Sequence, residues 1–244
     1  MNIAIIGYGK MGKELRSVAI EQGLMVRAII DPLVKEADFP DITEESTRDI
    51  EVGIEFTAPS VTVDNIKKMA RLGKNMVVGT TGWYDRLDEI KKTVEEAGIG
   101  FVYSPNFSLG MNLFFKLVEE AAKLFNRYEM YDVFSYELHN NQKVDSPSGT
   151  ARVIGKILID HIDRKKKLVF DKLDRRIEKD ELHLASVRAG SIPGIHVVGF
   201  DTEADTIELK HEARSRKGFA LGAVLAAKWI GGKKGFYTMA DVLK

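Results

Sequence analysis

The sequence predicts an α/β protein with a doubly wound parallel sheet and a second α+β domain that contains a mixed or antiparallel sheet. Three observations predict this fold. Short apolar runs alternate with amphipathic stretches through residues 1–107, a glycine-rich turn follows the first run, and strand patterns gather between residues 131 and 213. Strands that alternate with helices favour a parallel sheet, whereas consecutive strands favour a separate α+β unit.

The first domain is expected to repeat a strand and a helix. Apolar runs predict strands at 2–7, 25–31, 52–56, 75–79 and 100–104, and 3.6-residue periodicity predicts helices at 10–23, 61–73 and 84–98. Gly23 is placed to end the first helix. Residues 32–50 are polar and weakly periodic, so they predict a degenerate strand or a loop.

A phosphate-binding turn is predicted where the first strand meets the first helix. Its residues are Gly7, Tyr8, Gly9, Lys10, Met11 and Gly12. This GxGxxG pattern between strand and helix is typical of a Rossmann-type domain, in which pyrophosphate rests on the helix N-terminus. Asp31 ends the second strand, where a carboxylate bonds a ribose hydroxyl and repels a 2′-phosphate. The predicted cofactor is NADH or NADPH, with NADH favoured, although Lys35 leaves NADPH open.

Polar loops follow other strands of this sheet, and ligands bind at the carboxyl ends of parallel strands. The expected cofactor contacts are Phe56, Thr57, Gly79, Thr80, Thr81, Ser104, Pro105, Asn106 and Phe107. Ordinary turn chemistry is the alternative interpretation of these loops. Residues 104–108 are also a candidate hinge, because two domains imply closure over a substrate.

The second domain carries a compact group of polar side chains. Residues 131–139 alternate, with Phe134, Tyr136 and Leu138 on one face and Ser135, Glu137 and His139 on the other. We expect a half-buried strand with His139 at its end on the polar side.

Lys143 follows this strand in the next loop. Ser148, Gly149 and Thr150 then open a helix over residues 150–162, with Ser148 as a possible N-cap. A lysine, a histidine and a helix N-terminus in one span suit a carboxylate ligand.

The rest of the chain is assigned more briefly. Strands are expected at 182–190, 195–202 and 206–213, and helices at 112–128 and 218–232, the last returning to the first domain. Residues 163–167 are a charge run, interpreted as a solvated face. The other histidines lack metal-ligand spacing, so no metal is predicted, and only His196 is expected near the site. The predicted domains are 1–107 plus 216–244 for the dinucleotide, and 108–215 for the substrate; the resemblance described below adds oligomerisation to the role of the second domain.

Composition narrows the class of protein. The chain has 36 basic and 36 acidic residues, so it shows no overall charge footprint for nucleic acid or an anionic membrane. No apolar run approaches the roughly 20 residues of a membrane span, and no signal-peptide pattern is present. The sequence contains no cysteine, which excludes thiolate chemistry. We expect a cytoplasmic protein.

The segment "ELHNNQKVDSPSGTA" at residues 137–151 resembles the dihydrodipicolinate reductase family, also called 4-hydroxy-tetrahydrodipicolinate reductase. The motifs "GTTG", "SPNFS" and "RAGSIPGIH" support the resemblance. It implies NAD(P)H-dependent reduction of 4-hydroxy-tetrahydrodipicolinate to tetrahydrodipicolinate in diaminopimelate and lysine biosynthesis. It also implies a homotetramer formed through the sheet of the second domain.

The resemblance further implies roles for individual residues. His139 and Lys143 would donate protons, Gly149 and Thr150 would bind a carboxylate of the substrate, and the glycine turn would hold the cofactor. Asn140 stands where the family pattern has a second histidine that touches the substrate, and Asn keeps hydrogen bonding without charge.

Two other functions stay open from the residues alone. One is another amino-acid dehydrogenase of similar layout, which explains the nucleotide domain but not the polar block at 137–151. The other is an NAD(H)-sensing module without catalysis, which would not need that block.

Overall fold

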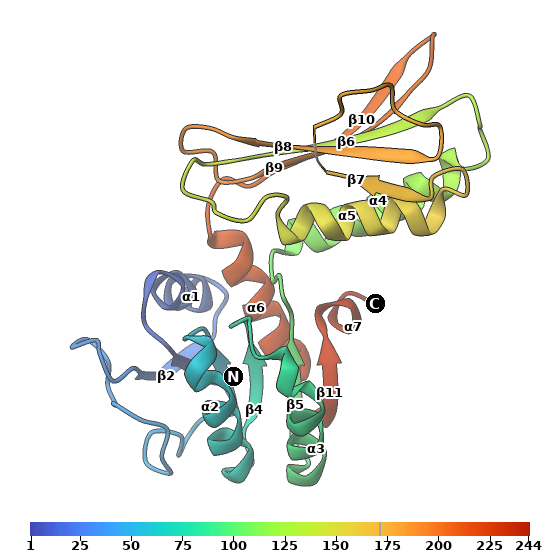
Figure 1. The fold of residues 1–244 in the computed structure, drawn as a ribbon. Coiled ribbons are helices and arrows are strands. Elements are labelled where there is room, and N and C mark those ends of the chain that lie inside the picture. Colours follow the sequence, from blue (N-terminus) through green and yellow to red (C-terminus); the bar gives the residue numbers. More distant parts are fainter. Residues whose placement is uncertain (171) are drawn as a thin grey trace. The chain divides into compact units, whose positions relative to one another are not determined.

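The computed structural model describes residues 1–170 and 172–244 and consists of two compact units. The first unit joins Met1–Asn112 to Arg216–Lys244, and the second is Leu113–Ser215. Figure 1 shows the elements of both. Within the described residues, no helix combines the length and apolar character that crossing a membrane requires.

The first unit contains a six-stranded parallel sheet in the order β11-β5-β4-β3-β1-β2. Its strands are β1 (Asn2–Ile6), β2 (Met25–Ile30), β3 (Val52–Glu55), β4 (Asn75–Val78), β5 (Gly100–Tyr103) and β11 (Gly235–Thr238). Its helices are α1 (Lys10–Glu21), α2 (Pro59–Arg71), the 3₁₀ turn η1 (Tyr84–Arg86), α3 (Leu87–Ala97), α6 (Lys217–Ile230) and α7 (Met239–Val242). The sequence analysis did not anticipate β11 and α7, which are each four residues long.

Helices cover both faces of this sheet, which confirms the doubly wound prediction. Leu15 of α1 and Ala223 of α6 belong to one apolar cluster, together with Ile3 and Ile5 of β1. On the other face, side chains of α2 and α3 pack against Ala4, Ile6 and their neighbours. Strands buried on both faces explain why each apolar run is nearly continuous rather than alternating.

Residues 31–51 form no strand. A single parallel bridge joins Ile30 to Phe39 beside β2, where a further strand of the sheet would lie. Asp38 accepts a hydrogen bond from the N–H of Ile29 at 2.8 Å and holds this segment against the sheet edge. Of the two interpretations left open by the sequence, the loop is correct.

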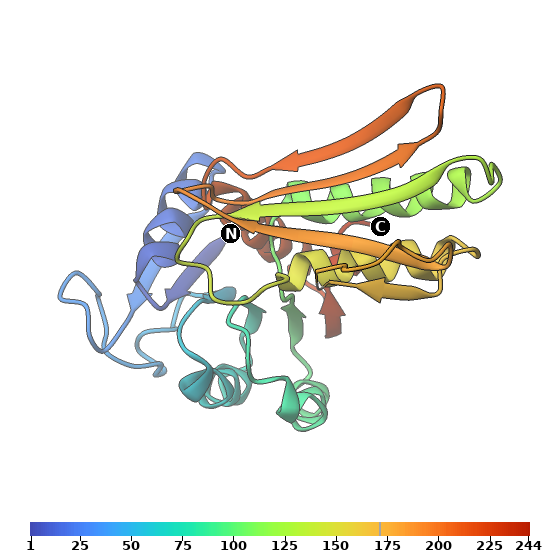
Figure 2. The same cartoon turned by 45° about the horizontal axis from the view of Figure 1, so that its top comes forward.

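The second unit is a five-stranded mixed sheet in the order β10-β9-β6-β8-β7. Its strands are β6 (Asp132–His139), β7 (Lys167–Val169), β8 (Glu181–Arg188), β9 (Ile195–Asp201) and β10 (Thr206–Glu212). β6 pairs antiparallel with β9 and parallel with β8. The helices α4 (Leu109–Phe125) and α5 (Gly149–His161) run along the same side of the sheet in both ribbon views (Figures 1 and 2).

The burial of β6 reverses the expected orientation. Ser135, Glu137 and His139 lie on the buried face, whereas Phe134 and Tyr136 are only half-buried. The polar and apolar residues of β6 alternate as predicted, but which face of a sheet is buried depends on the elements that pack against it. Here the helices cover the polar face, so the polar group around His139 is enclosed.

The interpretation of residues 163–167 as a solvated face holds for Asp163, Lys166 and Lys167, which are exposed, but is wrong for Lys165. Lys165, in the charge run at 163–167, is 3 % exposed and pairs with Asp132 at 2.7 Å while donating to the carbonyl oxygen of Glu181. In α4, Leu113 and Leu117 are exposed, and the core uses the face that carries Phe114 and Val118. The helix is apolar on more than one side, so periodicity alone did not choose between the faces.

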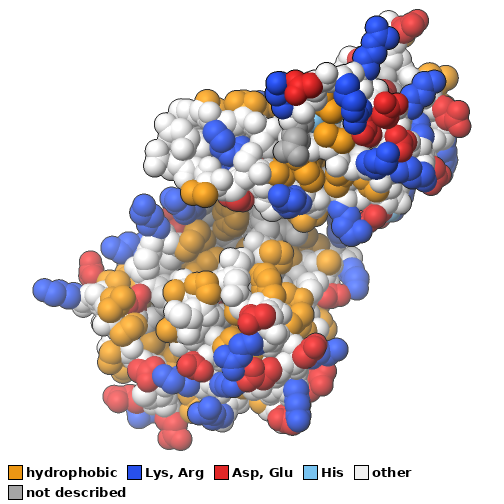
Figure 3. Space-filling model, in the orientation of Figure 1, with side chains coloured by type: hydrophobic (Ala, Val, Ile, Leu, Met, Phe, Trp, Pro, Cys, Tyr) orange, Lys and Arg blue, Asp and Glu red, His pale blue; other side chains and the backbone are white. Residues whose placement is uncertain are grey.

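Charges of both signs are mixed over the surface seen in Figure 3, as the equal numbers of acidic and basic residues suggest.

Candidate functional site

Packing requires glycine at two positions of the turn between β1 and α1. A Cβ atom on Gly7, whose φ is +92°, would lie 2.3 Å from the carbonyl oxygen of Phe56. A Cβ on Gly12 would lie 2.2 Å from the carbonyl oxygen of Gly7. These contacts let strand and helix approach closely, as the GxGxxG pattern predicts.

Gly9 is different, because a Cβ atom there would meet nothing within 4 Å. It is the N-cap of α1, makes no side-chain cap, and the first turn contains no acidic residue. The helix N-terminus therefore presents N–H groups and a positive dipole end beside open space. The space beside Gly9 is empty of protein atoms, so a phosphate of a dinucleotide can approach the helix N-terminus there.

A cavity of about 690 Å³ extends from Gly9 along the ends of β1, β2 and β3. Asp31 lines it, and its two carboxylate oxygens accept hydrogen bonds from the N–H groups of Tyr8 at 2.7 Å and Leu33 at 2.8 Å. The same carboxylate thus fixes the glycine turn, a role that the sequence did not indicate. Asp41, Asp64 and Lys68 also line the cavity, and Lys68 pairs with Asp41.

Most of the other expected cofactor residues line two further cavities of the first unit. Lys10, Met11, Phe56, Thr57, Gly79, Thr80 and Thr81 line a second cavity of about 390 Å³, which also reaches Gly9. Pro105 and Phe107 line a third, of about 290 Å³. Tyr8 and Ser104 are 7 % and 4 % exposed, and the hydroxyl of Ser104 donates to the carbonyl oxygen of Asn106 at 2.8 Å.

A buried acid that the sequence analysis did not single out lies under these loops. Glu55 ends β3, is fully buried, and accepts hydrogen bonds from the hydroxyls of Thr57 and Thr62. Its Oε2 has no partner among the described residues. Burial raises the pKa of Glu55, so the neutral acid is favoured.

In the second unit, a buried carboxylate ties β6 to the start of α5. Ser148 is the N-cap of α5, and its Oγ accepts a hydrogen bond from the N–H of Ala151 at 3.1 Å. The N–H of Ser148 donates to Glu137 Oε1 at 2.9 Å, and its hydroxyl donates to Oε2. The strand that ends in His139 is thereby held against the helix N-terminus.

Two residues of β8 complete the surroundings of Glu137. The hydroxyl of Ser186 donates to Oε1 at 2.8 Å, and Arg188 Nη2 donates to the same oxygen at 2.9 Å. Burial opposes ionisation of Glu137, but the hydrogen bonds from Ser148, Arg188 and Ser186 outweigh it and lower its pKa to about 2. The group is an anion at neutral pH. The sequence analysis did not single out Arg188 or Ser186, although Arg188 opens the quoted "RAGSIPGIH" motif and Ser186 lies just before it.

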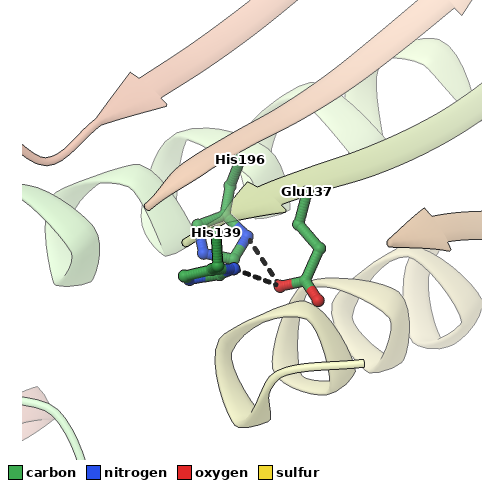
Figure 4. Close-up of side chains that lie close together, drawn as sticks. All are labelled: Glu137, His139 and His196. Atoms are coloured by element: carbon green, nitrogen blue, oxygen red, sulfur yellow. Dashed lines mark ion pairs between the residues drawn. The ribbon is translucent and has the colours of Figure 1, made fainter. Parts of the chain in front are cut away.

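Two histidine rings face this anion (Figure 4). His139 Nδ1 is 3.3 Å and His196 Nδ1 is 3.9 Å from Glu137 Oε2. Their ring centroids are 5.2 Å apart at an interplanar angle of 71°. Burial lowers the pKa of His139, which Glu137 partly opposes, and burial lowers the pKa of His196 to about 4.

The ligand atoms of Glu137, His139 and His196 also lie within 4.8 Å of one another, close enough to consider a metal ion. The guanidinium of Arg188 and the three donors of Ser148 and Ser186 already engage the carboxylate. We therefore treat the group as a hydrogen-bonding cluster and assign no metal to it.

The remaining predicted substrate residues lie in the loop before α5 and in its first turn. Lys143 Nζ is 2.7 Å from Asp145 Oδ1, and its side chain is 26 % exposed. A Cβ on Gly149 would meet nothing within 4 Å, so the start of α5 is open to a ligand. Asn140 uses its amide within the loop, accepting from the N–H of Gln142 at 3.1 Å and donating to the carbonyl oxygen of Ile192 at 3.4 Å.

The first unit defines the protein as a Rossmann-type α/β protein with room for a dinucleotide, and the second adds a mixed-sheet domain with an enclosed His–Glu cluster. Two family models match the chain, described as dihydrodipicolinate reductase N-terminus over residues 1–107 and C-terminus over residues 110–243. The chain belongs to the dihydrodipicolinate reductase family.

Curated relatives agree with this assignment. The chain is 35% identical over 243 residues to the 4-hydroxy-tetrahydrodipicolinate reductase of Christiangramia forsetii, which covers 100% of this chain and 98% of the relative. It is 41% identical over 196 residues to the enzyme of the same name from Laribacter hongkongensis, covering 78% of this chain and 72% of the relative.

Solved structures show the same fold. A dipicolinate-bound dihydrodipicolinate reductase from Paenisporosarcina sp. TG-14 matches with a TM-score of 0.78 at 22% identity, over 99% of this chain and 98% of that one. The myo-inositol dehydrogenase of Corynebacterium glutamicum matches with a TM-score of 0.54 at 15% identity, over 97% and 90% of the two chains. The fold is thus shared with dehydrogenases outside the family.

Proposed function

We propose that this protein is a 4-hydroxy-tetrahydrodipicolinate reductase, which uses NADH or NADPH to form tetrahydrodipicolinate in diaminopimelate and lysine biosynthesis. Membership of the family supports this function. The structural observation that carries it is the position of His139, 3.3 Å from the carboxylate of Glu137, which is hydrogen-bonded to Ser148 at the N-terminus of α5. That arrangement joins a proton-transfer group to an anion-binding helix end, and neither a sensor nor the nucleotide domain requires it.

The cofactor is assigned to the first unit. Gly9 and the N-terminus of α1 would hold its pyrophosphate, and Asp31 a ribose hydroxyl. When bound, the nicotinamide supplies the hydride for the reduction. Three aspartates and one lysine line the 690 Å³ cavity, and that lysine is already paired with Asp41. This surplus of negative charge supports a preference for NADH, because a 2′-phosphate would be repelled.

The substrate is assigned to the second unit. N–H groups at Gly149 and Thr150 and the amine of Lys143 would bind a carboxylate, and Ser148 keeps this helix end in place. When the substrate binds, the amine of Lys143 would leave Asp145 and pair with a carboxylate of the substrate. Fixing the ring by its carboxylates supplies orientation, which can account for much of a rate enhancement.

His139 is the proposed proton donor to the reduced ring. Burial lowers its pKa, so the ring is mainly neutral in the ligand-free protein at neutral pH. A dianionic substrate would favour the imidazolium, since a nearby opposite charge raises the pKa of a histidine. Substrate binding would thus charge the donor when it is needed, with Lys143 as a second donor.

A homotetramer in the cytoplasm is the proposed working form, as the family resemblance implies. The sheet face opposite the helices supports an assembly role. Phe134, Tyr136 and Leu138 are half-buried there, and Val187, which pairs with Leu138, is 45% exposed. Such a face is more apolar than a solvated sheet surface normally is.

The test is NADH oxidation, followed by absorbance, with substrate generated by the preceding synthase. Substrate-dependent oxidation that pyridine-2,6-dicarboxylate inhibits competitively is expected. Nucleotide binding without turnover would instead indicate a sensing module, and oxidation driven by an amino acid or its keto acid would indicate another dehydrogenase. Running NADH and NADPH in parallel measures the cofactor preference.

A further inference from the structure

The carboxylate of Glu137 has one acceptor position left. Ser148, Ser186 and Arg188 supply three hydrogen bonds to Oε1, and the hydroxyl of Ser148 supplies one to Oε2. Each carboxylate oxygen has two lone pairs, so the three donors crowd Oε1, whereas the single donor on Oε2 leaves that oxygen room for one further donor. Because Glu137 is completely buried, no solvent replaces a missing donor there.

Two imidazoles compete for that position (Figure 4). His139 Nδ1 is nearer, at 3.3 Å, yet it is buried and makes no hydrogen bond with any described residue. His196 Nδ1 reaches the same oxygen from β9 at 3.9 Å. The two residues are 8 % and 4 % exposed, and their rings meet edge to face. The two Nδ1 atoms cannot both donate a hydrogen bond to this one lone pair at the same time.

We propose that His139 and His196 share the last acceptor site of Glu137, which makes His196 a positioning residue that sets the tautomer and proton affinity of His139. When His139 donates Nδ1–H to Oε2, its Nε2 is left to exchange a proton with the substrate. When His196 takes the site, His139 loses its carboxylate partner and binds a proton less tightly. The inference rests on the proposed function in that His139 is the proton donor.

Other charged groups around His139 do not offer this sharing. Lys143 and Arg188 disfavour its protonation, and Asp145 favours it, through space. Around His196 the further groups are His211, next to it on β10, and Lys143. Among the ion pairs of the described residues, Glu137 Oε2 is the atom that lies within 4 Å of both imidazoles.

The experiment is a mutant cycle read by NMR titration of the His139 ring in the ligand-free protein. The chain has 5 histidines, and His139→Asn identifies the signal. The pKa of His139 is measured in the wild type, H196L, E137Q and the double variant. H196L removes the competitor and is expected to raise the pKa of His139 by about 0.5. This is a fraction of the shift in pKa of about one to three that a nearby opposite charge causes.

The cycle separates sharing from a change in local polarity. Leucine at 196 alters polarity equally in both backgrounds, so the rise is expected only where Glu137 is present. An equal change in the pKa of His139 in the E137Q background would overturn the proposal, because His196 would then act on His139 through packing or local polarity and not through Glu137.

A conservative variant guards against misfolding. H196N keeps a side-chain donor near the position of Nδ1, so a His139 titration like that of the wild type is expected. A shift in H196N as large as in H196L contradicts a role for the Nδ1 donor. The titration does not require turnover. If the protein failed to reduce the substrate but the pKa of His139 still depended on His196 through Glu137, the proposed reductase function would be refuted and this inference would stand.

Discussion

The backbone N–H of Ser148 donates a 2.9 Å hydrogen bond to the carboxylate of Glu137, two residues before His139. The hydroxyl of Ser148 donates to the same carboxylate, and its Oγ caps α5. One buried anion therefore positions both the strand end that holds the histidine and the helix end that is open at Gly149.

Replacing His139 by Gln is expected to lower kcat by about 10²–10⁴, the usual range for loss of a general acid. NADH affinity should not change, because the cofactor is assigned to residues of the other unit. Steady-state kinetics and NADH fluorescence titration measure the two quantities. His161→Gln is the matched control, since that ring bonds the carbonyl oxygen of Ile157 at the end of α5. A nearly normal kcat in His139→Gln would remove the assigned role.

Replacing Lys143 by Met is expected to weaken pyridine-2,6-dicarboxylate binding about 10- to 100-fold. A hydrogen bond to a charged group contributes about 1.5–3 kcal/mol, and methionine keeps the aliphatic length. Calorimetry measures the Kd. Lys156→Met provides the control, because Lys156 lies on α5 but pairs with Asp160 at the surface. Equal Kd values for Lys143→Met and the wild type would contradict carboxylate binding by this amine.

Asp31→Asn is expected to raise the ratio of NADPH to NADH efficiency about tenfold. The substitution removes a charge that would repel a 2′-phosphate by one to a few kcal/mol near a protein surface. Asn retains an acceptor for the N–H of Tyr8, although it cannot reproduce both hydrogen bonds. The measurement is kcat/KM with each cofactor. An unchanged ratio would show that other residues select the cofactor.

Glu55→Gln is expected to remove a pH dependence of stability. Burial raises the folded-state pKa of Glu55 above 4.5, so its stabilising contribution is complete below pH 4.5 and is lost as the pH rises through the folded value. Between the two pKa values the wild type loses about 1.4 kcal/mol per pH unit relative to the variant. Urea unfolding from pH 4.5 to 9 measures this difference. Parallel stability curves for wild type and variant would contradict it, and exposed Glu44→Gln is the control.

Val187→Glu is expected to reduce the proposed tetramer to smaller species. A buried unpaired carboxylate in an interface is costly, whereas on a monomer surface it is harmless. Sedimentation velocity measures the mass, and circular dichroism checks the fold. Thr206→Glu, at the exposed start of β10, is the control. A variant that remains tetrameric would place the interface elsewhere.

Local sequence determined the first unit and the chemical content of the site. Each buried parallel strand is a continuous apolar run, and Gly7 and Gly12 are required by contacts within one strand–turn–helix unit. The N-cap at Ser148 was also predictable, because a cap acts within one helical turn. Such features depend on neighbours in the chain, so spacing and residue type reveal them.

Tertiary structure decided which faces are buried and which side chains meet. Alternation in β6 separated the polar and apolar faces, but only the helices packed on the sheet determine that Glu137 and His139 are enclosed. Arg188 and His196 reach Glu137 through strand pairing with residues 49 or more positions away. Pairing across that separation depends on the register of whole strands, and a local pattern carries no information about it. The sequence alone therefore determined which groups are available for chemistry, and the sheet decided how they share one carboxylate.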